Sequence, residues 1–288
     1  MKLLSLNCRG LGNPETVQEL QTLVKLEVPQ VVFLMETRLD VRSIEWLRIK
    51  LGFHGALGDR ARFGGGLALL WSNEVSVQIR SYSPSRIDAE ILPNDGASWR
   101  FTGFYGNPDH HRRIESWDLL RKLGSDSSLP WMICGDFNEI VDNGEKLGNR
   151  SRPQRQMKIF RDALDDCKLE DLGYQGPKFT WCNMQHNEDV VFARLDRGVC
   201  TREWLHLFPS AKARIIPFVF SDHHAVIVDC LRTTPRLLDR KHQFRFEAMW
   251  LKRDNCEEVI RQAWAHPQQG TKMFCLCQKI KACRVALL

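Results

Sequence analysis

The sequence predicts a mixed α/β fold in which sheets are flanked by helices. Short, uncharged apolar runs such as Val31–Met35 and Trp131–Cys134 have no helical period, which indicates buried strands. Other segments, such as residues 75–79, alternate apolar and polar side chains, as strands with one solvent-exposed face do. Between them, apolar residues recur at helical spacing, as in residues 14–26. Strands and helices interspersed in this way favour a mixed sheet system covered by helices.

Expected strands follow one another from the N-terminus to residue 231. Most are bounded by Gly, Pro, Asn, Asp or Ser, residues that interrupt regular structure. Gly64, Gly65 and Gly66, for example, precede the apolar run Leu67–Trp71. The expected strands are residues 2–6, 31–35, 67–71, 75–79, 87–91, 99–105, 131–134, 179–181, 190–195, 215–220 and 225–231.

Four amphipathic helices are expected between these strands. Residues 14–26 form the first, with Asn13 as its N-cap and Pro14 at its first position. The second is short, and we expect Ser43 to cap it. The third and fourth flank the strand at residues 131–134, and their apolar positions are Ile114, Trp117, Leu120 and Leu123 in one and Met157, Phe160 and Leu164 in the other.

Charge divides the chain into two parts. We expect residues 1–231 to form one domain, and residues 232–288 to be a basic linker or truncated extension with a helix around Asn255–Ala265. Residues 1–231 carry 29 Lys and Arg against 30 Asp and Glu, whereas residues 232–288 carry 12 against 5. Because the basic excess lies in the extension, the net charge of +6 says little about what the domain binds.

Composition favours an intracellular protein with no membrane partner. The apolar runs are far shorter than the roughly 20 residues that a membrane-spanning helix needs. Asn7 and Arg9 interrupt the first apolar run, so the N-terminus does not resemble a signal peptide. The ten cysteines form no CxxC pairs and are expected to be reduced thiols.

Polar side chains follow the ends of several apolar runs. These residues are Asn7, Glu36, Asp136 with Asn138, and Asp222 with His223. In open sheets, binding sites collect at strand ends on one side. Each residue alone also fits a turn, a surface charge or a packed histidine, but the repetition favours a shared site. The ligand set is rich in oxygen and lacks Cys, which suits Mg²⁺ or Mn²⁺, and such a metal would polarise a phosphate.

A basic cluster begins eight residues after Asn138. Its members are Lys146, Arg150, Arg152, Arg155, Lys158 and Arg161. The cluster is either a solvated helix face or a contact to a phosphate backbone, and its closeness to the central strand keeps the second interpretation open.

Five motifs occur in the order found in the endonuclease/exonuclease/phosphatase family, which includes DNase I and the apurinic/apyrimidinic endonucleases. The motifs are Leu6-Asn7, Met35-Glu36-Thr37, Gly135-Asp136-Phe137-Asn138, Arg194-Leu195-Asp196-Arg197 and Ser221-Asp222-His223. The resemblance covers residues 1–231 and implies a four-layered α/β/β/α sandwich of the DNase I type. Within the family, the motifs Asn-Cys-Arg-Gly-Leu-Gly, Met-Glu-Thr-Arg, Phe-Thr-Trp and Arg-Leu-Asp-Arg are most similar to the endonuclease domain of plant LINE-type (non-LTR) retrotransposon polyproteins.

The C-terminal part of the chain supports the same resemblance. Residues Phe244 to Glu247, with Trp250, look like the sequence that follows the endonuclease domain in such polyproteins. No reverse-transcriptase region is present, so we expect a truncated element. The resemblance implies DNA as the partner, and a nuclear location if the substrate is chromosomal DNA.

The resemblance also implies roles for matching residues. Glu36 would hold Mg²⁺ or Mn²⁺, helped by Asn7 and Asp222. Asp136 would orient or deprotonate the attacking water, and Asn138 would bind the scissile phosphate. The remaining implied or expected site residues are His223 for charge stabilisation or proton transfer, Asp196 to orient His223, Tyr105 near the phosphate, Thr180 and Ser221 as supporting phosphate contacts, and Arg150, Arg152 and Arg155 on the DNA backbone.

The implied reaction is in-line hydrolysis of a DNA phosphodiester that leaves 3′-hydroxyl and 5′-phosphate ends. In a retrotransposon the 3′ end would prime reverse transcription. Two alternatives stay open. One is a phosphoesterase of the same fold that acts on small substrates such as inositol phosphates or sphingomyelin, and the other is a relic that binds nucleic acid without turnover.

Overall fold

The structure is a computed structural model that describes residues 1–58, 65–94, 96–126, 128–148, 150–185, 190–230 and 256–265, and single residues at 279, 282, 283 and 286. The chain divides into two compact units, Met1–Thr234 and Pro235–Leu288. Predictions on Gly64, Leu231, Phe244 to Glu247 and Trp250 fall outside the described residues. In the second unit the expected helix is present as α6, Cys256–Ala265.

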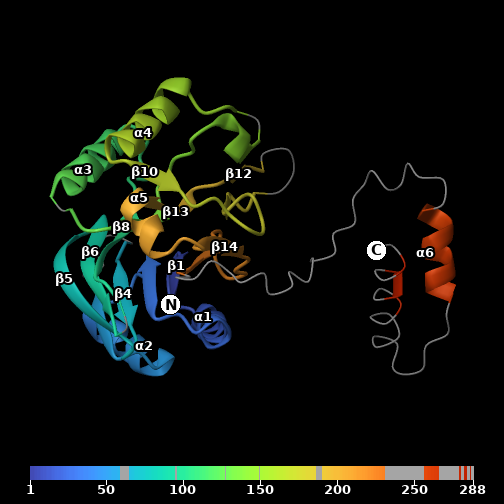
Figure 1. Ribbon diagram of the computed structural model, residues 1–288, viewed down its shortest axis with the longest axis horizontal. Coiled ribbons are helices and arrows are strands. Elements are labelled where there is room, and N and C mark those ends of the chain that lie inside the picture. Colours follow the sequence, from blue (N-terminus) through green and yellow to red (C-terminus); the bar gives the residue numbers. More distant parts are fainter. Residues whose placement is uncertain are drawn as a thin grey trace. The chain divides into compact units, whose positions relative to one another are not determined.

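Two six-stranded sheets form the centre of the first unit (Figure 1). The first contains β1 (Lys2–Asn7), β2 (Val31–Met35), β3 (Gly55–Gly58), β4 (Ala68–Trp71), β14 (Lys212–Ile216) and β15 (Ala225–Asp229), in the order β14-β15-β1-β2-β4-β3. The second contains β5 (Val75–Ser83), β6 (Arg86–Pro93), β7 (Trp99–Tyr105), β8 (Trp131–Asp136), β10 (Leu169–Asp171) and β13 (Asp196–Thr201), in the order β10-β13-β8-β7-β6-β5. A small third sheet contains β9 (Lys146–Leu147), β11 (Trp181–Cys182) and β12 (Phe192–Ala193).

Helices cover the outer face of each large sheet, which produces four layers (Figure 1). The helices of the first unit are α1 (Pro14–Glu27), α2 (Val41–Leu51), α3 (Arg113–Ser125), α4 (Gln154–Asp166) and α5 (Arg202–Leu207), with a 3-10 turn at Asn143–Glu145. Apolar residues of α1 and α2 pack on the first sheet, and those of α3 and α4 pack on the second. The predicted α/β/β/α sandwich is therefore confirmed.

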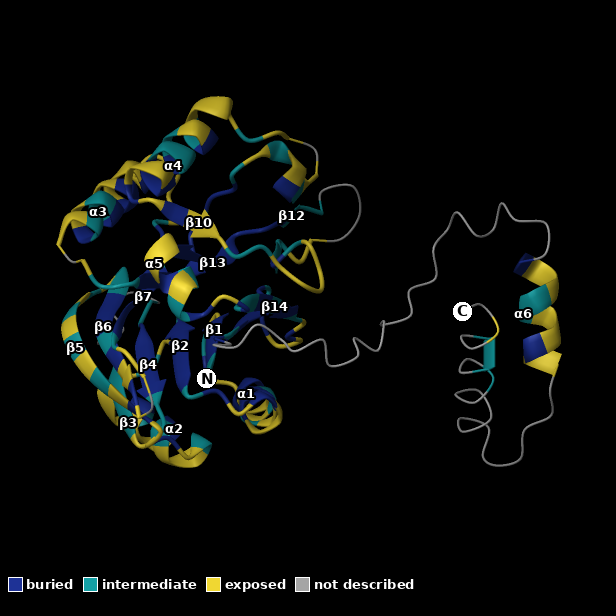
Figure 2. Cartoon of the chain, in the orientation of Figure 1, coloured by how far each residue is buried: buried dark blue, intermediate teal, exposed yellow. Residues whose placement is uncertain are grey.

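The alternation of side chains along the strands sorts them into three cores. In β8, Met132 and Cys134 point between the two sheets, whereas Ile133 points toward α3 and α4. Phe137 continues the outer side and packs its ring 5.5 Å from that of Phe160. Burial of each such large side chain contributes about 1.5–3 kcal/mol. Figure 2 shows these buried segments inside the layers, with exposed residues on the outer helix faces.

Most expected helices and strands are present, with some corrections. Asp40, not Ser43, caps α2, because the Asp40 carboxylate accepts the N–H of Ser43 at 2.7 Å. The strand expected at residues 190–195 is limited to Phe192–Ala193, and the one expected at residues 215–220 ends at Ile216. The strands β3, β9, β10 and β13 were not predicted, since they are short or begin with charged residues.

None of the helices in the described parts of the chain is long and apolar enough to span a bilayer. The eight cysteines that can be described are thiols outside any disulfide, and most of them are buried. Cys275 and Cys277 lie outside the described residues.

Candidate active site

Four strand ends meet at one edge of the sandwich. β1 and β2 are parallel, with Asn7 opposite Met35, so Asn7 and Glu36 leave the first sheet side by side. In the second sheet, the parallel pair β7 and β8 places Tyr105 opposite Asp136. The resulting cleft has a volume of about 410 Å³. Its lining includes Glu36, Tyr105, Asp136, Asn138, Asp222 and His223.

Asn7 connects the two sheets at the base of the cleft. Its Nδ2 donates hydrogen bonds to Glu36 Oε1 at 2.9 Å and to Asp136 Oδ2 at 3.1 Å, and lies 3.5 Å from His223 Nε2. Asn7 is fully buried, so losing these partners would leave an amide unsatisfied, which costs about 1–3 kcal/mol. The predicted convergence of these separate segments is therefore present in the fold.

His223 lies between two carboxylates. Its Nδ1 is 2.8 Å from Asp196 Oδ2, and its Nε2 is 3.8 Å from Asp136 Oδ2. Burial acts to lower the pKa of His223, but the negative charges of Asp196 and Asp136 outweigh it and raise that pKa above its usual value. Burial and the Asp196 charge likewise raise the pKa of Asp136. The geometry thus places a carboxyl group and an imidazole close enough for the charge of each to affect the other.

Tyr105 and Asn138 also line the cleft. The Tyr105 hydroxyl donates to Glu36 Oε1 at 2.9 Å, and burial together with the Glu36 charge raises its pKa. The Asn138 side chain donates to the carbonyl oxygen of Gly106 at 2.9 Å, and its backbone N–H donates to Asp136 Oδ1 at 2.8 Å. Gly106 is required here, since a Cβ would lie 2.2 Å from the carbonyl oxygen of Phe137.

Several cleft residues have left-handed backbone conformations. The φ angles are +48° at Glu36, +55° at Asn138 and +49° at Arg9. Outside glycine this conformation costs roughly 1–2 kcal/mol, and somewhat less for Asn. Such strain collects at functional sites, where it aims side chains that an extended strand would direct elsewhere. These turns direct Glu36 and Asn138 into the cleft.

Asp222 closes the cleft on the side of the first sheet. Its Oδ2 accepts hydrogen bonds from Arg9 Nη1 at 2.9 Å and Trp181 Nε1 at 3.1 Å. Its Oδ1 is buried and has no hydrogen-bond partner among the described residues. Asp222 and Glu36 both line the cleft, and their carboxylate oxygens are hard donors of the kind that suits Mg²⁺ or Mn²⁺. Asn7 presents its amino group to the carboxylates, so in this arrangement it positions Glu36.

The remaining predicted site residues separate into two groups. Thr180 and Ser221 lie beneath the site and not in its lining. The Thr180 hydroxyl accepts the backbone N–H of Asp196 at 2.9 Å, and the Ser221 hydroxyl donates to the Asn7 carbonyl at 2.8 Å. We therefore correct their expected role from phosphate contact to support of Asp196 and Asn7.

Within the basic cluster, the structure selects two members. Arg152 and Lys146 line the cleft, whereas the exposed Arg150 and Arg155 do not. The sequence prediction missed Arg9, Arg113 and Trp181, which also line the cleft. Arg9 could have been predicted, since it lies two residues after Asn7. Arg113 has no such neighbour in the sequence and looks like an ordinary helix residue.

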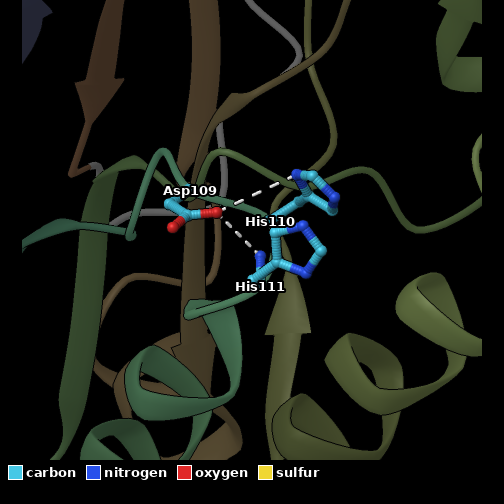
Figure 3. Close-up of side chains that lie close together, drawn as sticks. All are labelled: Asp109, His110 and His111. Carbon is cyan, nitrogen blue, oxygen red and sulfur yellow. Dashed lines mark hydrogen bonds and ion pairs between the residues drawn. The ribbon is translucent and has the colours of Figure 1, made fainter.

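A second group of possible metal ligands lies on the exposed turn between β7 and α3 (Figure 3). Asp109 Oδ1 accepts the backbone N–H of His111 at 2.9 Å and lies 3.9 Å from His110 Nδ1. The two imidazole rings are 3.8 Å apart. The carboxylate is thus satisfied by closing its own turn, which explains the group without a ligand.

Comparisons with known proteins support the architecture. A family profile described as "Endonuclease/Exonuclease/phosphatase family" matches residues 4–223. No curated protein matches the sequence at a significant level.

Several solved structures have a similar fold. The endonuclease domain of TRAS1, a telomere-specific non-LTR retrotransposon, has a TM-score of 0.61 at 14% identity, covering 81% of this chain and 99% of that chain. The 3′-5′ exonuclease NExo from Neisseria meningitidis has a TM-score of 0.60 at 15% identity, covering 80% and 100%. The AP endonuclease LMAP from Leishmania major has a TM-score of 0.63 at 15% identity, covering 79% and 86%.

Proposed function

From the premise that this chain belongs to the endonuclease/exonuclease/phosphatase family, we propose that it is a metal-dependent phosphodiesterase that nicks DNA. The observation that carries the proposal is the contact of Asn7 with both Glu36 and Asp136, which joins a carboxylate from each sheet in one cleft. A cleft with acidic oxygens and a buried imidazole matches the requirements of phosphodiester hydrolysis.

Glu36 and Asp222 would hold a Mg²⁺ or Mn²⁺ ion, because their carboxylates offer hard oxygen donors. Asn7 fixes Glu36 by its hydrogen bond, and Tyr105 donates a second hydrogen bond to the same oxygen. When bound, such an ion would neutralise charge on the phosphate and polarise it toward attack.

Asp136 would orient the attacking water and accept its proton, since its Oδ2 faces the cleft beside His223. His223, kept protonated by Asp196, would stabilise charge that develops on the phosphoryl oxygens. The Asn138 side-chain amide, which donates to the Gly106 carbonyl oxygen in the free protein, would instead donate a hydrogen bond to the scissile phosphate. The products would carry 3′-hydroxyl and 5′-phosphate ends.

DNA is the proposed substrate for two reasons. The cleft carries the cationic side chains of Arg9, Lys146 and Arg152, which suit a phosphate backbone. Solved structures of the same fold include nucleases and a phosphatase bound to product DNA. Arg150 and Arg155 lie outside the cleft lining, so they would reach only a longer duplex that extends past the site.

We further propose that the nicking activity is that of a LINE-type retroelement, with residues 1–231 as the catalytic domain and residues 232–288 as an extension. The proposal is supported by the residue sequence of the motifs around Asn7, Glu36 and Asp196, and by the fold shared with the TRAS1 endonuclease domain. Action on chromosomal DNA would require a nuclear location.

The test is a nicking assay on supercoiled plasmid with Mg²⁺. We expect relaxation of the plasmid by the wild type and none by an Asp136→Ala, His223→Ala double variant. Equal nicking by both proteins would show that the activity has another origin. Ligation of the nicked product by DNA ligase without prior treatment would identify 3′-hydroxyl and 5′-phosphate ends.

Assays with other substrates separate the alternatives. A phosphoesterase for small substrates would hydrolyse inositol phosphates or sphingomyelin but leave the plasmid supercoiled. A non-catalytic relic would bind DNA and give no turnover on any of these substrates.

A further inference from the structure

The wall of the cleft next to Asn138 carries more positive than negative charge. Three cations line it: Arg113 at the start of α3, Lys146 of β9, and Arg152 in the loop before α4. Arg113 and Arg152 share the carboxylate of Glu139, which is 1% exposed. Glu139 Oε2 accepts a hydrogen bond from Arg113 Nη1 at 3.0 Å, and Glu139 Oε1 lies 2.9 Å from Arg152 Nε.

The carboxylate of Glu145, the residue before Lys146, is paired with other arginines. Glu145 is bound by Arg194 at 2.7 Å and by Arg197 at 2.6 Å. The Lys146 ammonium donates a hydrogen bond to the backbone carbonyl oxygen of Arg150, and this uncharged group does not neutralise it. Two guanidinium groups therefore pair with the one carboxylate of Glu139, and the Lys146 ammonium adds a third positive charge, so this wall carries a positive excess.

Burial of these cations makes the excess costly to the free protein. Burial lowers the pKa of Lys146, and the charge of Arg152 lowers it further. Burial also lowers the pKa of Arg152. The negative charge of Glu139 acts to raise this pKa, and the positive charge of Arg113 lowers it further. A bound anion would relieve this repulsion, because opposite charge favours the protonated form of both groups.

Hydrogen bonds connect Arg113 of this wall to the turn beside the catalytic site. Arg113 Nε and Nη2 donate to the carbonyl oxygens of Asn107 and Pro108, each at 3.2 Å. These residues follow Gly106, whose carbonyl oxygen accepts the Asn138 side chain. The positive wall is therefore continuous with the residue proposed to bind the scissile phosphate. At about 410 Å³, the cleft falls within the range of roughly 300–1,000 Å³ typical of ligand pockets.

We propose that Arg113, Lys146 and Arg152 form a second phosphate subsite, which binds the phosphate next to the scissile one in a nucleic-acid strand. The subsite rests on the proposed nuclease function and narrows its substrate to chains with at least two phosphodiester groups. Lys146 and Arg152 supply the ligand contacts, and Arg113 also positions the turn beside Asn138.

The experiment measures binding without turnover. Asp136→Asn protein is titrated with a fluorescein-labelled thymidine oligonucleotide in Mg²⁺, and unlabelled competitors displace the label. One competitor, TpT, has a single phosphodiester, and the other, TpTpT, has two. We expect TpTpT to bind about tenfold more tightly than TpT, since one hydrogen bond to a charged group contributes on the order of a tenfold change or more.

The subsite variant is Lys146→Gln in the same background, because Lys146 has no buried carboxylate partner that its loss would leave unpaired. We expect this variant to lose the advantage of TpTpT while keeping the affinity for TpT. The matched control is Lys158→Gln, which removes the same charge from the exposed face of α4, where Lys158 pairs with Asp162 at 2.7 Å. The control should keep the full advantage.

Two results would overturn the subsite. One is a TpTpT advantage that survives Lys146→Gln, and the other is an equal loss in Lys158→Gln, which would indicate general charge attraction. Failure of TpT and TpTpT to compete at all would also exclude it. Arg152→Gln provides a second variant, and its melting temperature shows whether it folds. Plasmid nicking is measured separately with the wild-type protein, which retains Asp136. Failure of the subsite and failure of the nuclease proposal are therefore distinguishable.

Discussion

His223 Nδ1 lies 2.8 Å from Asp196 Oδ2, although the two residues come from different segments of the chain. Asp196 begins β13, which pairs with β8, whereas His223 lies in the loop before β15 of the first sheet. The pair therefore spans the two sheets. The pairing also holds the imidazole Nε2 3.8 Å from Asp136 Oδ2, so the charges of His223 and Asp136 interact.

Asp196→Asn should reduce kcat by about 10²–10⁴-fold, the range for loss of efficient general acid–base catalysis. The amide keeps the shape of the carboxylate but can no longer stabilise a protonated His223. Single-turnover nicking rates at saturating enzyme measure the change, and circular dichroism verifies folding. A variant as active as the wild type would exclude a role for Asp196 in orienting or charging the imidazole.

The pH profile of nicking should follow the coupled pair. Asp136 acts deprotonated, and burial with the Asp196 charge raises its pKa, so activity should rise with pH above the usual carboxyl range. His223 acts protonated, and since the neighbouring carboxylates outweigh burial and raise its pKa, activity should decline only above the usual imidazole range. Asp196→Asn removes a negative charge and should move both limbs to lower pH, as measured from log(kcat/KM) against pH. An alkaline limb that stays in place would contradict this assignment.

Metal binding should be detectable without catalysis. Mn²⁺ in excess should raise the melting temperature of the wild type, because a ligand at 100 times its Kd stabilises the native state by about 2.7 kcal/mol. Glu36→Gln should remove most of this shift, whereas Glu74→Gln, at an exposed position away from the cleft, should keep it. Thermal unfolding with and without Mn²⁺ provides the measurement, and an unchanged shift in Glu36→Gln would place the ion elsewhere.

Asn7→Ala should abolish nicking while leaving a folded protein of reduced stability. The change removes the donor that fixes Glu36 and Asp136, and its partners keep their charges in a buried site. Asn13→Ala is the matched control, because Asn13 only caps α1, and losing such a cap costs about 1 kcal/mol. Plasmid nicking and urea unfolding of both variants test the difference; full activity in Asn7→Ala would refute the role of Asn7.

The ion-pair network of the buried residues Glu145, Arg194 and Arg197 with the more exposed Asp171 should make stability fall in acid. Burial acts to raise the pKa of Glu145 and of Asp171, but the arginine charges and hydrogen bonds outweigh it and lower both values. A carboxylate with a lowered folded-state pKa contributes stability above its unfolded pKa, and that contribution is lost as the pH falls through the folded pKa. Urea midpoints should therefore decrease below about pH 4, the usual carboxyl range.

Glu145→Gln tests the network directly. It leaves Arg197 buried without its strongest partner, so we expect a loss of about 3–5 kcal/mol at neutral pH and a weaker dependence on acid. An acid dependence equal to that of the wild type would assign the effect to other carboxylates.

The sequence by itself determined the layers and the chemical nature of the site. Alternation in β8 sends Ile133 to one core and Met132 to the other, and this follows from the two-residue period of a strand. Asn7, Glu36 and Asp136 could be found because each ends an apolar run, which is a local signal.

Only the tertiary structure decided which cations join them. Arg150 and Arg155 stand in the same basic run as Arg152, yet Arg152 alone of the three lines the cleft, and Arg113 arrives from another helix. Linear spacing describes neighbours along one element, whereas contacts between elements depend on how strands pair and sheets stack. Asp196 reaches His223 because β13 pairs with β8 and the two sheets pack face to face, a relationship that no local period encodes.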